Sequence, residues 1–142
     1  MAFWKNWTWF KKKLLKNYNT QTLQGRLHRE KDIIANRIVK KTYLKPKYIS
    51  PCHAGSLFGV ITAAGDVFPC EILDDKIIGN LRDYGMNFSD LWKSQKKEEI
   101  KNNILDSKCN CTYECALSYN ILANWRYQPN LISAALDFTS KF

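Results

Sequence analysis

Residues 57–70 read LFGVITAAGDVFPC, and this stretch decides the expected centre of the fold. Two runs of β-branched and aromatic residues flank Ala63-Ala64-Gly65-Asp66, which is the pattern of a β-hairpin. Gly65 can adopt the positive φ that a tight turn requires at no steric cost. A hairpin here turns the chain back and carries Cys70 towards Cys52, and Pro69 suits the end of its second strand.

The cysteines are the second informative feature. All five lie in the later part of the chain: Cys52, Cys70, Cys109, Cys111 and Cys115. The first two follow the pattern C-x12-G-x4-C, and the last three lie in CNCTYEC. Neither a secretory signal peptide nor an apolar run long enough to span a membrane is found, so a cytoplasmic location is expected. In that reducing compartment clustered cysteines are typical of metal ligands, and we take all five as candidate ligands.

Two kinds of metal site suit four thiolates, namely tetrahedral zinc and an iron–sulfur cluster. Zinc ribbons normally offer two C-x2-C knuckles, and this chain has neither. The wide and irregular spacing favours a cubane [4Fe–4S] cluster, whose four irons are reached from different directions. A zinc-stabilised module that contacts nucleic acid or a protein partner stays open as the alternative.

The positive charge belongs to the first fifty residues. They carry 13 Lys and Arg against Glu30 and Asp32, a net charge of +11, whereas residues 51–142 have a net charge of −2. Because the basic residues interleave with Leu and Ile at helical spacing, they indicate a solvated helix face, and nucleic acid is not the expected partner.

An aromatic stretch opens the chain. Trp4, Trp7 and Trp9 precede Lys11-Lys12-Lys13, so residues 3–16 could contact an anionic membrane surface. We do not favour this interpretation, because such a stretch more often packs on a partner protein.

Helical periodicity predicts a helix over residues 20–43, which ends before Pro46. The apolar residues that share its face are Leu23, Leu27, Ile34 and Ile38. Gly79-Asn80 predicts a turn, and an amphipathic segment begins at Phe88 with Asn87 or Ser89 as its cap.

Two further helices are expected after the last cysteines. Thr112 is the expected N-cap of the first, with Glu114 and Cys115 in its first turn and Leu117 and Ile121 inside. Pro129 suits the first turn of the second helix. The residues predicted to pack inward from it are Leu131, Ile132, Ala135 and Leu136.

These patterns together predict an α+β fold. It consists of a small β-hairpin with cysteine-rich loops packed by several short helices, and a basic N-terminal helical segment precedes it. We expect a basic helical leader over residues 1–50 and a metal-binding domain over residues 51–142.

Several motifs in order resemble the SPASM domain, the auxiliary iron–sulfur domain at the C-terminus of radical SAM proteins. They are residues 51–55, 61–73, 78–82, 91–94 and 109–115, and the likeness covers residues 31–142. The C-x(9–15)-G-x4-C element of that family is met in full.

The resemblance implies a ligand set. Cys52, Cys70 and Cys115 are similar to ligands of the first auxiliary [4Fe–4S] cluster, with Cys109 or Cys111 as the fourth and the other one spare. Because the family's fuller cysteine pattern is not met, one cluster is expected and a second complete cluster is not. In that family the domain transfers electrons or positions the substrate for a catalytic barrel.

The resemblance does not include the catalytic part of a radical SAM enzyme. No C-x3-C-x2-C motif occurs, and the 51 residues before Cys52 cannot hold a barrel. The chain resembles the tail of a radical SAM protein, so we expect it neither to bind nor to cleave S-adenosylmethionine by itself. The implied partners are a radical SAM catalytic domain or a redox partner, in cis or in trans.

Overall fold

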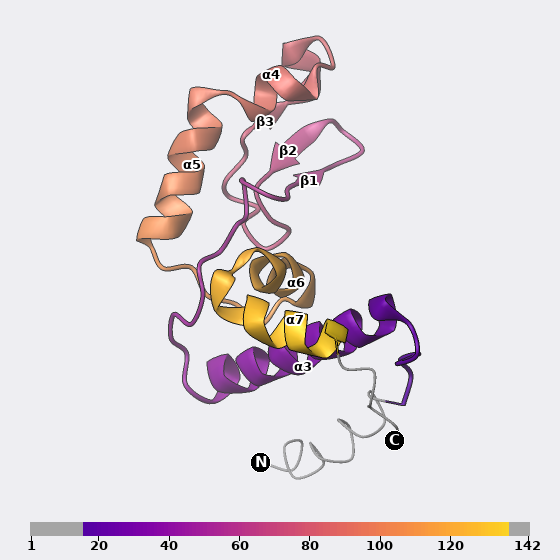
Figure 1. Cartoon of the computed structure of the whole chain (residues 1–142). Helices are drawn as coiled ribbons and strands as arrows, with labels where there is room; N and C mark the ends of the chain where they lie inside the picture. Colours follow the sequence, from indigo (N-terminus) through magenta and orange to yellow (C-terminus); the bar gives the residue numbers. More distant parts are fainter. Residues whose placement is uncertain (1–15, 137–142) are drawn as a thin grey trace.

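The computed structural model describes residues 16–136, which form a sheet half and a helical half (Figure 1). The sheet half holds β1 (Val60–Ile61), β2 (Asp66–Phe68), β3 (Gly79–Asn80), α4 (Phe88–Trp92) and α5 (Gln95–Asp106). The helical half holds α3 (Leu23–Leu44), α6 (Glu114–Ala123) and α7 (Gln128–Leu136). Short 3-10 helices cover Leu81–Tyr84 and Trp125–Tyr127. This arrangement confirms the α+β class. None of the described helices combines the length and apolar character needed to cross a membrane.

The predicted hairpin is confirmed. β1 and β2 pair antiparallel with Val60 opposite Phe68 and Ile61 opposite Val67. Gly65 has a φ of 89°, in the left-handed region that favours glycine, and its N–H donates to the Thr62 carbonyl at 2.9 Å. Gly65 therefore has the positive φ that was predicted for the turn. Pro69 follows the end of β2.

The prediction of a turn at Gly79-Asn80 is wrong, because these residues form β3. The N–H of Ile78 donates to the Val67 carbonyl and that of Leu81 to the Gly65 carbonyl, each at 2.8 Å. These bonds make β3 the third antiparallel strand, beside β2. The change of direction comes later, where Gly85 with a φ of 58° ends the 3-10 helix.

A core joins the sheet to α4 and α5, and we call it the sheet core. Its buried members are Cys52, Ala54, Val67, Cys70, Ile78, Leu81, Leu91, Ile100 and Ile104. Asn87 caps α4 as predicted, because its Oδ1 accepts a bond from the Ser89 N–H at 3.1 Å. Ser94 caps α5 in the same way, so the apolar segment from Phe88 is two helices.

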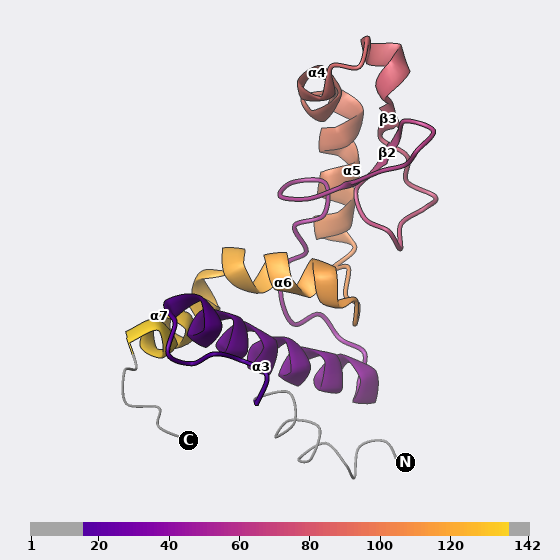
Figure 2. The same cartoon turned by 90° about the vertical axis from the view of Figure 1, so that its right-hand side faces the viewer.

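The helical half has its own core, which we call the helical core. Its buried members are Ile34, Ala35, Ile38, Leu117, Ile121 and Leu131. The predicted helix over residues 20–43 is confirmed as α3, which begins after Thr22. α3 packs against both α6 and α7 (Figures 1 and 2). Leu23, placed on the inward face by its spacing, is 55% exposed.

Two details of α6 and α7 differ from expectation. The N-cap of α6 is Tyr113 rather than Thr112, and no side chain caps the helix. Ile132 and Leu136 are exposed, whereas Leu131 is buried. Ile132 and Leu136 lie about 100° and about 140° around the helix from Leu131, so they face away from the helical core.

The predicted division at residue 50 stays a prediction. α3 comes from the first part of the chain, and it shares the helical core with α6 and α7 from the second part. The stretch considered for a membrane surface, residues 3–16, lies outside the described residues except for Lys16.

Candidate metal centre

Cys52 reaches the junction of the two halves on an extended segment that is tied to α6. The N–H of His53 donates to Asn120 Oδ1 at 2.8 Å. Asn124, the C-cap of α6, donates from its Nδ2 to Ser50 Oγ at 3.0 Å. Both asparagines are buried, so their bonds fix the backbone on either side of Cys52.

Cys70 is placed by the hairpin. It follows Pro69 at the end of β2, and its carbonyl accepts a bond from the Leu73 N–H at 3.3 Å. Cys52 and Cys70 are both members of the sheet core, 7% and 4% exposed. The hairpin with its tight turn at Gly65 therefore places Cys70 in the same buried cluster as Cys52.

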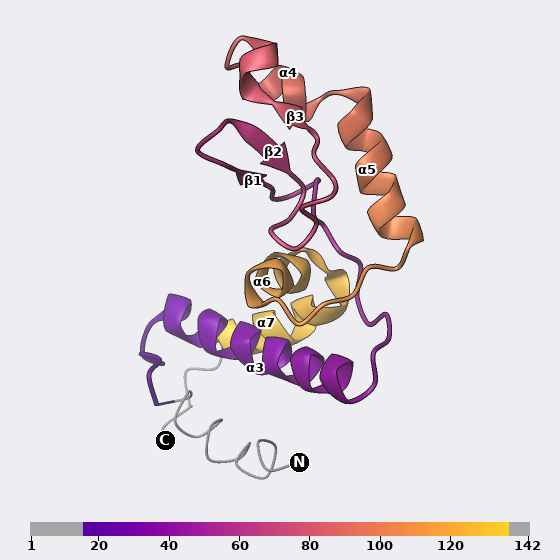
Figure 3. The ribbon, with the colours of Figure 1, turned by 180° about the vertical axis from the view of Figure 1, so that it is seen from behind.

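Cys109 and Cys111 come from the loop between α5 and α6. Lys108 has a φ of 51°, a left-handed conformation that ends α5, and the Cys109 N–H donates to the Ile104 carbonyl at 3.3 Å. The loop then passes back across the junction, and Cys109 packs against the sheet core. Figure 3 shows this loop running between the end of α5 and the start of α6.

A small cavity of about 20 Å³ lies where these segments meet. Cys52, Cys109 and Cys111 line it, together with Ile38 and Thr42 of α3. Leu117 and Asn120 of α6 also line the cavity. The cavity thus lies between the sheet core and the helical core.

The thiols at this junction lie within electrostatic reach of one another. Burial raises the pKa of Cys109 to about 11, with further contributions from Cys52, Cys111 and Cys70 and from a hydrogen bond with Cys52. Burial also raises the pKa of Cys111 to about 11, assisted by Cys52 and Cys70. Four thiolates crowded in this way repel one another, so they can ionise together only around a cation.

Cys115 faces a different place. It lies in the first turn of α6, is exposed, and lines an open groove of about 610 Å³ between α3 and α6. The other residues that line the groove are Leu23, Gln24, Leu27, His28, Lys31, Ser118, Tyr119 and Leu122. Cys115 is therefore against the N-terminal half of α3, whereas Cys109 and Cys111 share a cavity with its C-terminal half.

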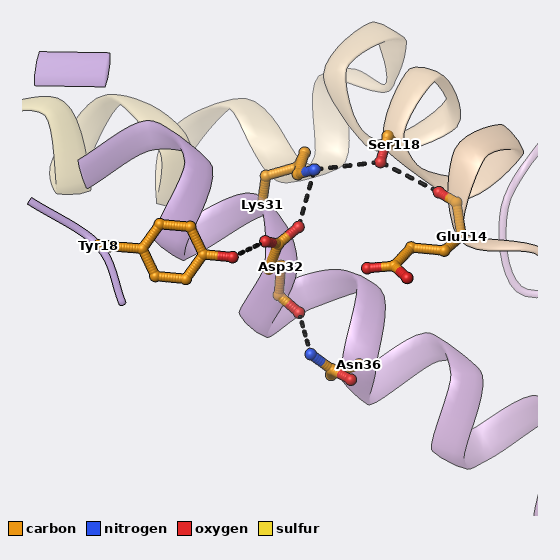
Figure 4. Close-up of polar contacts among 6 residues, drawn as sticks. All are labelled: Tyr18, Lys31, Asp32, Asn36, Glu114 and Ser118. Atoms are coloured by element: carbon orange, nitrogen blue, oxygen red, sulfur yellow. Dashed lines mark hydrogen bonds and ion pairs between the residues drawn. The ribbon is translucent and has the colours of Figure 1, made fainter. Parts of the chain in front are cut away.

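A polar contact holds the first turns of α6 on α3 (Figure 4). Lys31 Nζ donates to Ser118 Oγ at 3.1 Å and pairs with Asp32 Oδ1 at 2.7 Å. The Tyr18 hydroxyl donates to the other oxygen of Asp32. Burial first, and then the bond to Asp32, raise the pKa of Tyr18 above its ordinary range. These bonds fix the side of α6 that carries Cys115.

The chemistry of the four converging thiols fits a thiophilic metal or an iron–sulfur cluster. Within residues 16–136, no three His, Cys, Asp or Glu side chains are grouped closely enough to hold one metal ion. The cavity of about 20 Å³ has room for about one water molecule. A cubane is larger, so the segments that carry the thiols would have to move apart to hold it, as expected when cofactor binding is coupled to folding.

Sequence reasoning did not identify Asn120 and Asn124 as residues that hold the site. The available signal was their position, because asparagine is a poor helix former and Asn120 lies one turn after the apolar Leu117. A buried asparagine at such a place normally has a polar partner from another segment.

The comparisons with known proteins agree with the chemistry of the site. Residues 49–116 match the family model of SPASM, an iron–sulfur cluster-binding domain. The match includes all five cysteines and the sheet core, and it ends in the first turn of α6. Neither a curated protein nor a solved structure matches the chain.

Proposed function

We propose, from the premise that residues 49–116 form a SPASM iron–sulfur cluster-binding domain, that this chain holds one [4Fe–4S] cluster at the junction of its two cores. The observation that carries the proposal is the convergence of four thiols from three separate segments, since Cys52, Cys109 and Cys111 line one cavity and Cys70 shares the sheet core with Cys52. Four thiolates are the usual ligand set of a cubane.

The ligands we assign are Cys52, Cys70, Cys109 and Cys111. The resemblance pointed to Cys115 in place of one of the last two. The geometry favours the other set, because Cys115 lines the groove on the far half of α3. In our assignment Cys115 is the spare thiol.

The residues of the chain have distinct parts in this function. The four thiols lose their protons on binding, and their negative charge is balanced by iron. Asn120 holds the backbone beside Cys52 through the His53 N–H. Ile38 and Leu117 line the cavity with apolar surface and limit the access of water to it.

A bound cluster would supply a one-electron carrier. We therefore propose that the domain transfers electrons, or positions substrate, for a radical SAM catalytic domain provided in cis or in trans. In this proposal the chain is the auxiliary part and the partner performs the chemistry.

Anaerobic purification followed by metal analysis tests the proposal. A brown protein with about four irons and about four acid-labile sulfides per chain supports it. A colourless protein with one zinc per chain contradicts it and favours a zinc-stabilised binding module.

A further inference from the structure

A row of exposed basic side chains lies beside the cavity. Arg37 and Lys41 are four residues apart on α3, Lys45 is its C-cap, and Lys47 follows Pro46. We call these four residues the basic stripe. All four are exposed, and none of them has a carboxylate partner in the part of the chain that the structure describes.

The stripe is close to the proposed cluster because of helix geometry. Ile38 and Thr42, which line the cavity, are each one position after a residue of the stripe. Successive residues are about 100° apart around a helix, and a helix with its side chains is about 10 Å across. Arg37 and Lys41 are therefore within about one helix diameter of the cavity, and Lys47 is two residues before Ile49, which also lines it. Figures 1 and 3 show the end of α3 and the loop after α5 on the same side of the molecule.

The charged side chains of this stretch all have the same sign. Residues 33–65 contain no Asp or Glu, so the basic side chains have no acidic neighbour along this stretch. Two apolar side chains lie among them, Leu44 at 61% exposed and Tyr48 at 40% exposed. Exposed aromatic and apolar residues surrounded by charge are typical of protein–protein interfaces.

We propose that the basic stripe is the docking surface for an acidic electron-carrier protein. The inference rests on the proposed function, because it gives the cluster a partner with which to exchange one electron. The electron lost by the reduced carrier is gained by the cluster, and no bond or proton changes place. A surface of one sign steers an oppositely charged partner and orients it, which suits a brief encounter near a redox centre.

Binding is the primary test and needs no turnover. The probe is an oxidised plant-type [2Fe–2S] ferredoxin of strongly negative net charge, titrated into the protein at low ionic strength by calorimetry. The test variant is K45E/K47E, and the matched control is K93E/K96E. Lys93 and Lys96 are exposed at α4 and α5, at the opposite end of the molecule from α3 (Figure 1). Both variants lower the formal net charge from +9 to +5.

We expect K45E/K47E to weaken binding about tenfold and K93E/K96E to weaken it less than about twofold. The difference should vanish in about 0.5 M salt, where exposed charges are screened. Equal weakening by both variants would reduce the effect to net charge and overturn the proposal, and so would the absence of any weakening. If a single-stranded oligonucleotide binds more tightly than the ferredoxin and loses affinity in K45E/K47E alone, the surface is a nucleic-acid site and the proposal is wrong.

A second readout separates this inference from the proposed function. Iron and sulfide are measured in the same samples, and the stripe variants should keep the wild-type content because no ligand is changed. Absence of iron in every sample contradicts the proposed function, whereas full iron content without stripe-dependent binding contradicts only the docking surface. With the cluster present, reduced ferredoxin should reduce K45E/K47E about tenfold more slowly than the control, and dithionite should reduce both at the same rate.

Discussion

The sheet core has nine buried members and the helical core has six, and the two cores differ in what they bury. The sheet core includes two thiols, Cys52 and Cys70, at its inner edge, and Cys109 packs against it. The helical core contains only apolar side chains. The helical half is held by apolar packing and by polar contacts such as Lys31 with Ser118, none of which involves a thiol. We therefore expect the order of the sheet half, and not that of the helical half, to depend on what the thiols bind.

Few polar contacts join the two halves. The described bonds from α6 to the segment around Cys52 are those of Asn120 with His53 and of Asn124 with Ser50. The cavity between the cores lies at this junction. We expect cluster binding to stabilise mainly this junction.

Removing a ligand should have the largest effect. Cys52→Ser removes a thiolate that no other residue replaces, so iron should fall from about four per chain to almost none. Hydrogen exchange of β2 should quicken in the variant, while exchange in α3 and α6 should change little, because the helical core has no ligand.

Cys115→Ser is the matched control for that variant. Its thiol lines the groove and not the cavity, so full iron content and unchanged exchange are expected. Loss of iron in this control would return Cys115 to the ligand set that the family resemblance implied.

The next test creates a cavity in the helical core, which contains no thiol. Ile121 is fully buried, and Ile121→Ala should lower the free energy of unfolding by about 2–5 kcal/mol. Chemical denaturation followed by circular dichroism measures this loss, and Ile121→Val should cost only about 0.5–1.5 kcal/mol. If the alanine variant also lost its iron under native conditions, the two cores would not be separable as we describe them.

The link between the halves should give a smaller effect. Asn120→Ala leaves the His53 N–H without its acceptor, and we expect a loss of about 1–3 kcal/mol in the free energy of unfolding. The cluster should also be lost faster on exposure to air, since the backbone beside Cys52 is freed. Asn102 is an exposed helical asparagine of α5, so Asn102→Ala is a suitable control that should change neither quantity. Identical behaviour of the two variants would mean that the Asn120 bond does not support the site.

The smallest effect concerns pH in the cluster-free protein. Cys109 and Cys111 have a pKa of about 11 when folded, above the value of about 8.5 for a free thiol. Because the pKa of these thiols is higher in the folded than in the unfolded protein, the folded state retains their protons up to a higher pH. The stability is therefore fully present below about pH 8.5 and is lost as the pH rises towards 11.

Because both thiols are only partly buried, we expect a loss of about 1 kcal/mol over this range. The urea midpoint measured between pH 8 and 11 gives the slope, and C109S/C111S should flatten it. An unchanged slope in that variant would assign the pH dependence to other groups.

Local signals explain what the sequence could predict. The hairpin rests on a glycine that the turn requires, and α3 rests on a long periodic run, so both were found. The cap at Asn87 is similarly local. The convergence of Cys52 and Cys70 followed from the hairpin alone.

The features that were missed depend on distant partners. β3 has only two residues and exists because Val67 and Gly65 offer it bonds. The exposed side of α7 is set by its contact with α3, which spacing in α7 cannot reveal. Cys111 lines the cavity and Cys115 lines the groove because of the way α6 lies on α3. The motif CNCTYEC alone could not predict that these two thiols face different places.

The most direct test of the central claim is the crystal structure of the anaerobically purified protein, with iron located by anomalous diffraction at its absorption edge. The account predicts one four-iron cluster bonded to the Sγ atoms of Cys52, Cys70, Cys109 and Cys111, with the Cys115 thiol free in its groove. Iron bonded to Cys115, or zinc in place of iron, would contradict it.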